Sequence, residues 1–156
     1  MRKTNKEGYR SRSAYKLIEI DNKFKLLEHG QKVIDLGACP GGWSQVASQK
    51  NSDVFAVDIK PMEPIKGVQF IQCDFISEFE ILREKFINQT FDIVLSDMAP
   101  GSCGLQSLDH LRIMILCEAA LSFAESFLKP GGKFIAKIFQ GECDKDFFNR
   151  LKKIFK

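Results

Sequence analysis

The chain has 156 residues, 44% of them hydrophobic, which is the size of one ordinary domain with enough apolar side chains for a core. No apolar run approaches the ~20 residues that span a bilayer, and the N-terminus lacks the apolar stretch of a secretory signal. The five cysteines are scattered, with no C-x-x-C pair and no nearby histidine, so we expect reduced thiols and no metal site.

The net charge of +3 is unevenly distributed along the chain. Residues 1–25 contain eight Lys or Arg against three Asp or Glu, residues 26–144 ten against sixteen, and residues 145–156 five against one. An acidic middle between two basic ends suggests that the ends contact a polyanion. A solvated basic terminus is the simpler alternative at this point.

The spacing of apolar residues predicts helices and strands in alternation from residue 13 onward. Helices are expected at 13–24, 43–48, 78–86, 108–128 and 146–155. Strands are expected at 32–36, 53–59, 68–74, 91–97 and 133–139, and Lys-Pro-Gly-Gly should end the long helix and turn the chain. Such an alternation predicts an α/β fold of the doubly wound kind, with a mostly parallel central sheet and helices on both faces.

Ligands of such sheets bind beyond the carboxyl ends of the strands, where the first strand is followed by a glycine-rich turn at residues 35–42. A phosphate P-loop would need a lysine where Trp43 stands, and a dinucleotide fingerprint would need a glycine where Cys39 stands. The remaining ligand for such a turn is S-adenosylmethionine, which Gly37 and Gly41 would let the backbone approach closely.

Acidic residues stand at the ends of the successive predicted strands. Asp58 can accept both hydrogen bonds of a ribose diol, and Asp74 is placed to accept one from an adenine amino group. Asp35 could face the ammonium group of the same ligand, Asp97 ends the fourth strand, and Lys137 lies within the fifth. A single acid of this kind could equally be a helix cap or a solvated loop residue, but four at successive strand ends favour a binding site.

Five blocks of the sequence resemble the FtsJ/RrmJ family of S-adenosylmethionine-dependent ribosomal RNA ribose 2′-O-methyltransferases. The blocks are YRSRSAYKLIEID, DLGACPGGWSQ, DIKPMEPIKGVQFIQCDF, LSDMAPG and LKPGGKFIAKIFQGE, in that order. The resemblance implies a Rossmann-like class I methyltransferase fold in one domain over residues 1–156. Within it, residues 1–25 would be a basic RNA-contacting segment with the first helix, and residues 32–156 the cofactor-binding α/β core.

The resemblance also implies roles for individual residues. The implied cofactor-binding residues are Gly41, Trp43, Asp58, Asp74 and Asp97. Trp43 could pack beside the cofactor or anchor its own helix, and the resemblance favours the first. The family has a catalytic Lys-Asp-Lys-Glu group, whose first three members match Lys16, Asp97 and Lys137, with Lys137 as the proton acceptor. Arg10 and Arg12 are candidates for contacts to RNA phosphates.

The fourth catalytic residue, a glutamate, lies in the family on a strand after the last helix, whereas this sequence ends at Lys156. Glu142 matches another part of the motif and does not replace it. We therefore expect the C-terminal strands of the sheet to be missing and residues 133–139 to form an exposed edge strand. A chain with roughly 35 to 45 further residues should be more soluble and more active.

The function implied by the resemblance is methylation of a ribose 2′-hydroxyl in ribosomal RNA, most simply that of the large subunit. The expected partner is ribosomal RNA or the large ribosomal subunit, bound by a monomer without membrane contact. The expected compartment is the cytoplasm, or a mitochondrion or other organelle if a presequence has been removed. The alternative is a catalytically silent module that binds S-adenosylmethionine and RNA and assists ribosome assembly. Small-molecule methylation is disfavoured, because a small neutral substrate would not need basic ends.

Overall fold

The structure is a computed structural model and describes residues 8–50, 52–98, 104–138 and 145–155. The helices are α1 (Ser13–Phe24), α2 (Gly42–Gln49), α3 (Phe79–Lys85), α4 (Gln106–Phe127) and α5 (Lys145–Ile154). The strands are β1 (Lys32–Leu36), β2 (Asp53–Asp58), β3 (Val68–Gln72), β4 (Phe91–Ser96) and β5 (Leu128–Ala136). Every element predicted from the sequence is present, with ends that differ by one or two residues in most cases.

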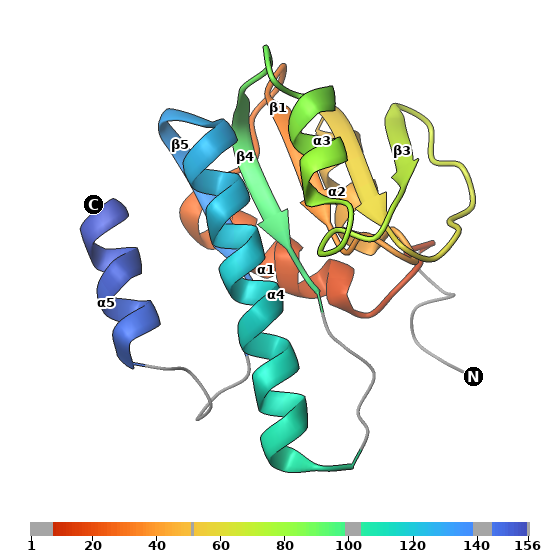
Figure 1. The fold of residues 1–156 in the computed structure, drawn as a ribbon. Coiled ribbons are helices and arrows are strands. Elements are labelled where there is room, and N and C mark those ends of the chain that lie inside the picture. The colour runs from red at the N-terminus through yellow and green to blue at the C-terminus, as the bar shows by residue number, and fades with distance from the viewer. Residues whose placement is uncertain (1–7, 51, 99–103, 139–144, 156) are drawn as a thin grey trace.

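The strands form one parallel sheet in the order β3-β2-β1-β4-β5 (Figure 1). Within the sheet, the chain passes first through β1, moves outward through β2 and β3, and then returns to the other side of β1 for β4 and β5. Asp35 of β1 stands in register with Ala56 of β2 and Leu95 of β4. The order of the strands reverses between β1 and β4, and this is where an open α/β sheet binds its ligands.

Helices cover both faces of the sheet. Val33 of β1 belongs to an apolar cluster with Leu17 of α1 and residues of α2. The next residue, Ile34, points to the opposite face and belongs to a cluster with Leu82 of α3 and Phe123 of α4. Because both faces are covered, β1 is apolar along most of its length and its last four residues are buried.

Helix α5 packs beside α4 and β5 (Figure 1). Phe147 is fully buried there, and the Phe155 ring stacks on the Phe134 ring of β5 with 5.7 Å between centroids. Lys152 and Lys153 are exposed. The helix is therefore amphipathic, as its sequence predicts.

The start of β5 corrects the predicted strand at residues 133–139. The strand begins at Leu128, which pairs with Phe91 of β4, and the next pair joins Lys133 to Ile93. The residues between these two pairs stand opposite a single residue of β4. The Lys-Pro-Gly-Gly sequence thus forms a bulge within β5 rather than a turn before it.

The end of β5 also corrects the prediction, since the strand stops at Ala136 and Lys137 follows it. The backbone N–H of Lys137 still donates a hydrogen bond to the Ser96 carbonyl at 2.8 Å. Lys137 therefore lies beside the end of β4 although it is outside the strand. Within the described residues β5 is an edge strand, as predicted.

Candidate active site

A cavity of about 540 Å³ lies at the carboxyl ends of β1, β2 and β4, a volume typical of small-molecule and cofactor sites. Its lining residues are Ser11, Ser13, Gly37, Cys39, Pro40, Val57, Asp58, Ile59, Lys60, Asp74, Phe75, Ile76, Asp97, Met98, Leu116 and Lys137. Five of the predicted site residues are among them: Gly37, Asp58, Asp74, Asp97 and Lys137. The structure therefore gathers residues from four predicted strand ends at one cavity.

The glycine-rich turn folds back onto β2. The N–H groups of Gly37 and Ala38 both donate to the Val57 carbonyl, at 2.8 and 3.0 Å. Gly37 has a φ of +75°, and a Cβ atom added there would collide with the Met98 side chain. Only glycine fits this position, and its backbone forms part of the cavity wall.

Asp58 connects the glycine-rich turn to the segment after β2. Its Oδ2 accepts a hydrogen bond from Cys39 N–H and its Oδ1 one from Lys60 N–H, both at 2.8 Å. These two bonds fix the orientation of the carboxylate at the cavity. Each oxygen has a second lone pair, so Asp58 can still accept hydrogen bonds from a ligand.

Asp74 lies at the cavity beyond the end of β3. Its Oδ1 accepts a hydrogen bond from Ile76 N–H at 3.0 Å. The Ser77 hydroxyl and the Ile76 N–H together lower the pKa of Asp74 below its ordinary value, so the side chain is a carboxylate and only accepts hydrogen bonds.

Asp97 and Lys137 form an ion pair at the cavity, with 2.9 Å between Oδ1 and Nζ. The Asp97 side chain is 14% exposed and the Lys137 side chain 41% exposed. The two residues follow neighbouring parallel strands, β4 and β5, which explains why their side chains meet. An amine held by a carboxylate at a cavity wall is a candidate for proton transfer.

Asp35 is fully buried and is not among the residues that line the cavity. Its Oδ2 accepts a hydrogen bond from the Ser44 hydroxyl at 2.6 Å. Burial raises the pKa of Asp35 to about 7, against the effect of the Ser44 hydrogen bond, and the nearby Asp97 acts in the same direction as burial. The predicted contact of Asp35 with a ligand ammonium remains a prediction.

Trp43 and Gly41 lie beside the cavity rather than in its described lining. Trp43 is 3% exposed, and its Nε1–H donates to the Ser13 carbonyl at 2.8 Å, so its side chain anchors α2 to the start of α1. Gly41 has a φ of +107°, and the space next to its Cα is occupied by the side chains of Met62 and Ile65. Cofactor contacts of Trp43 and Gly41 remain predictions.

The predicted RNA-contacting residues have different surroundings. The Arg10 guanidinium donates to the carbonyls of Glu63 and Pro64, at 2.5 and 2.6 Å, and so holds the loop after β2. Arg12 is exposed. The third catalytic candidate, Lys16, has a side chain that is 61% exposed and lies 3.3 Å from a Glu19 carboxylate oxygen, outside the described lining of the cavity.

Sequence reasoning missed two hydroxyl groups at the cavity, those of Ser11 and Ser13. The two Oγ atoms are 2.8 Å apart at the start of α1. Both residues belong to the first block of the family resemblance, for which the sequence predicts contact with RNA. The bond from Trp43 to the Ser13 carbonyl brings this segment to the cavity, and no pattern in the sequence reveals that bond.

The reversal of strand order at β1, the glycine-rich turn and the acids at successive strand ends define a Rossmann-like α/β protein with a site for a nucleoside-containing cofactor. The sequence matches the FtsJ-like methyltransferase family over residues 9–156, and the chain belongs to this family. It is 72% identical, over its whole length and 81% of the relative, to "Ribosomal RNA large subunit methyltransferase E" of Wolbachia pipientis wMel.

One solved structure agrees with this assignment, and a second shares the fold. The crystal structure of a protein described as a ribosomal RNA methyltransferase from Plasmodium falciparum matches with a TM-score of 0.79 and 34% identity, over 94% of this chain and 85% of that one. A TehB-like S-adenosylmethionine-dependent methyltransferase from Corynebacterium glutamicum has the same fold, with a TM-score of 0.60 and 17% identity over 97% of this chain and 76% of that one.

Among the described residues, no helix is both long enough and apolar enough to cross a membrane.

Proposed function

We propose that this protein transfers the methyl group of S-adenosylmethionine to a ribose 2′-hydroxyl of large-subunit ribosomal RNA. The observation that carries the proposal is the Lys137–Asp97 pair at a cavity suited to the cofactor. The name of the Wolbachia relative, at 72% identity, supports the choice of RNA.

The cavity fits S-adenosylmethionine in three respects. Its volume of about 540 Å³ suits a cofactor of this size. Gly37 lines the cavity without a side chain, so a ligand there can approach its backbone. Asp58 and Asp74 supply acceptors for the donors of the ribose and the adenine.

S-adenosylmethionine, when bound, supplies a methyl group already activated by its sulfonium. The chain must therefore orient the ribose hydroxyl in line with that methyl group and accept the hydroxyl proton. Lys137 Nζ is the acceptor in this proposal, and Asp97 Oδ1 holds it in place. A lysine accepts a proton only as the neutral amine.

The basic N-terminal segment supports an RNA substrate. Arg12 and Lys16 are exposed on or next to α1, whose first residues border the cavity. Such side chains contact phosphates and position RNA without reading its sequence. Because the Wolbachia relative is bacterial, the proposal places the reaction in the cytoplasm.

The test is transfer of radiolabelled methyl groups from S-adenosylmethionine to purified ribosomal RNA and to intact large subunits. The proposal expects incorporation into large-subunit RNA in at least one of these substrates. Cofactor binding without transfer to either would favour the silent binding module instead. The same assay separates free RNA from the assembled subunit as the substrate.

A further inference from the structure

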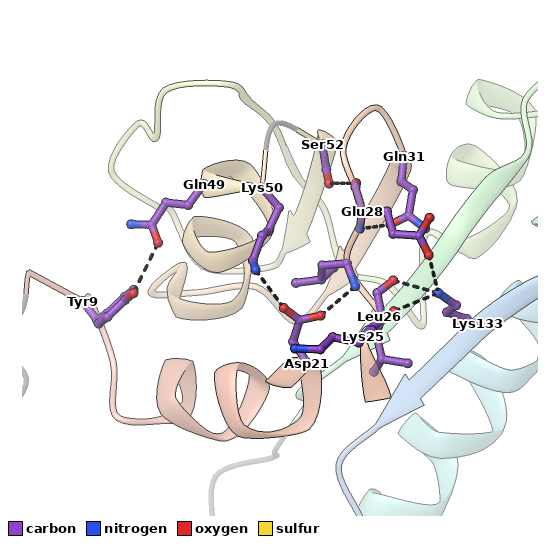
Figure 2. A network of polar contacts seen from close by, with 11 residues as sticks. Tyr9, Asp21, Lys25, Leu26, Glu28, Gln31, Gln49, Lys50, Ser52 and Lys133 are labelled. Atoms are coloured by element: carbon purple, nitrogen blue, oxygen red, sulfur yellow. Dashed lines mark hydrogen bonds and ion pairs between the residues drawn. The ribbon is translucent and has the colours of Figure 1, made fainter. Parts of the chain in front are cut away.

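The turn that leads from α1 to β1 is held from three sides (Figure 2). On the α1 side, Asp21 Oδ1 accepts a hydrogen bond from Leu27 N–H at 2.8 Å. On the α2 side, Lys50 Nζ lies 3.1 Å from Asp21 Oδ2. On the β5 side, Lys133 donates into the same turn.

Lys133 contacts the residues that directly follow α1 through their main-chain carbonyls. Its Nζ donates to the Leu26 carbonyl at 3.0 Å and to the Lys25 carbonyl at 3.4 Å, and it lies 3.3 Å from Glu28 Oε1 (Figure 2). Lys25 is the C-terminal cap of α1 and has a left-handed backbone conformation. These carbonyls belong to the helix cap and to the residue after it, so the contact fixes the chain where it leaves α1.

Burial would raise the pKa of Asp21, but the Leu27 N–H and Lys50 together keep it below its ordinary value. Asp21 is 4% exposed. The carboxylate therefore stays ionised and paired while Lys133 holds the turn from the other side. Together these contacts determine where the end of α1 lies relative to the sheet.

The same face of β5 continues toward the cavity. Residues 133, 135 and 137 follow the two-residue repeat of extended chain, so they share the face that α1 covers. Ile135 packs against the cluster that contains Ala14 and Leu17 of α1. Lys137 lines the cavity together with Ser13 at the start of α1. One face of β5 thus contacts the C-terminal end of α1 through Lys133. The same face leads to Lys137, beside the N-terminal end of α1, roughly 13 Å further along the strand.

We propose that Lys133 is a positioning residue for methyl transfer, which holds α1 so that RNA bound along it presents its ribose to Lys137. The inference rests on the proposed function, in which α1 contacts the RNA. It assigns Lys133 no contact with substrate or cofactor. A displacement of about 1 Å at a reacting centre can lower a rate up to about 100-fold, so an anchor at a distance can matter for catalysis.

The test compares four variants of the full chain. Lys133→Met keeps the apolar stem and removes the donors, and Lys133→Arg restores donors to the carbonyls. Glu28→Gln removes the ion pair but leaves the carbonyl contacts. Lys129→Met is the matched control on the same strand, since it breaks the 2.9 Å pair with Asp92, away from α1.

Single-turnover methylation is measured per S-adenosylmethionine-binding site, counted by calorimetry, so that unfolded protein does not lower the apparent rate. Lys133→Met should be roughly 10- to 100-fold slower with little change in RNA or cofactor affinity, and Lys133→Arg should recover most of the rate. Glu28→Gln and Lys129→Met should match the parent chain. An unchanged rate in Lys133→Met, or an equal loss in Lys129→Met, would overturn the inference.

Absence of RNA methylation by the parent chain would count against the proposed function and would not test the role of Lys133. Amide hydrogen exchange tests that role independently of activity. Amides of α1 should exchange faster in Lys133→Met than in the parent chain, whereas amides of α2 should exchange at the same rate in both. In Lys129→Met, the amides of α1 should exchange as they do in the parent chain. Equal exchange of α1 in Lys133→Met and the parent chain would contradict the anchoring role directly.

Discussion

Lys137 Nζ lies 2.9 Å from Asp97 Oδ1. Asp97 directly follows β4, and Lys137 directly follows the neighbouring strand β5. The parallel pairing of these strands brings the two residues together, and both line the cavity. This relationship links the fold to the proposed chemistry, because the sheet register places the proposed proton acceptor next to its carboxylate partner.

Replacement of Lys137 by Ala should abolish methyl transfer, since the ribose hydroxyl then has no proton acceptor. Cofactor affinity should stay within about twofold of the parent value, because Asp58 and Asp74, the proposed acceptors for the ribose and the adenine, are unchanged. Lys137→Arg should also be inactive, because a guanidinium pairs with Asp97 but does not give up its proton. Calorimetry and single-turnover kinetics measure both quantities, and substantial activity in Lys137→Arg would show that Nζ is not the acceptor.

Asp58→Asn should weaken cofactor binding about 10- to 100-fold. The amide cannot accept hydrogen bonds on both sides, so the bond to Cys39 N–H or the one to Lys60 N–H is lost along with acceptor capacity for the ribose. Asp53→Asn, at the exposed start of the same strand, is the matched control and should bind normally. Calorimetric titration with S-adenosylmethionine checks this, and equal affinities for both variants would remove Asp58 from the site.

Asp35 should make the stability of the protein depend on pH. Its carboxyl has an ordinary pKa of 3.8 when unfolded and one of about 7 when folded. The folded state therefore retains a proton that the unfolded chain loses above pH 3.8, and this contribution to stability falls as the pH rises through 7. Asp35→Asn has no proton to lose.

Urea unfolding of the parent chain and Asp35→Asn at pH 5 and pH 8 checks this expectation. Between pH 5 and pH 8, the free energy of unfolding should fall by about 1–4 kcal/mol more in the parent chain than in the variant. Parallel changes in both proteins would show that Asp35 is ionised in the folded state at pH 5.

Gly37→Ala should destabilise the fold by about 2–4 kcal/mol, because the new methyl group meets Met98 in addition to the strain of a left-handed backbone. Gly30→Ala is the control, since Gly30 has a similar φ of +78° with no atom close to a Cβ. That variant should cost only about 1–2 kcal/mol. Denaturation with urea measures the difference. Equal losses of stability in the two variants would mean that the Met98 side chain moves aside without an energetic penalty.

The fold was predictable because each strand is a short apolar run between glycine, proline or polar residues. β1 and the glycine-rich turn show this most clearly, since the buried positions of β1 follow from its sequence alone. The bulge in β5 was not predictable. Proline and glycine there favour a turn by their local preferences, but the pairing of Leu128 with Phe91 draws these residues into the strand.

The cavity was predicted in part, for a related reason. The end of a strand fixes where Asp58 and Asp97 lie, so their positions follow from the order of elements. The side chains of Trp43 and Arg10 depend instead on contacts with the Ser13 carbonyl and with the loop after β2, which are distant in sequence. No periodicity reveals such contacts, so the sequence left two roles open for Trp43 and did not indicate the contacts of Arg10.

The central claim is tested most directly by locating the transferred methyl group within the RNA. A methyl group on the ribose 2′-oxygen protects the neighbouring phosphodiester from alkaline cleavage, because that cleavage needs the free hydroxyl. After transfer of a radiolabelled methyl group to large-subunit RNA and hydrolysis in alkali, the account predicts label in resistant dinucleotides. Label found only in single nucleotides would place the methyl group on a base and would contradict the account.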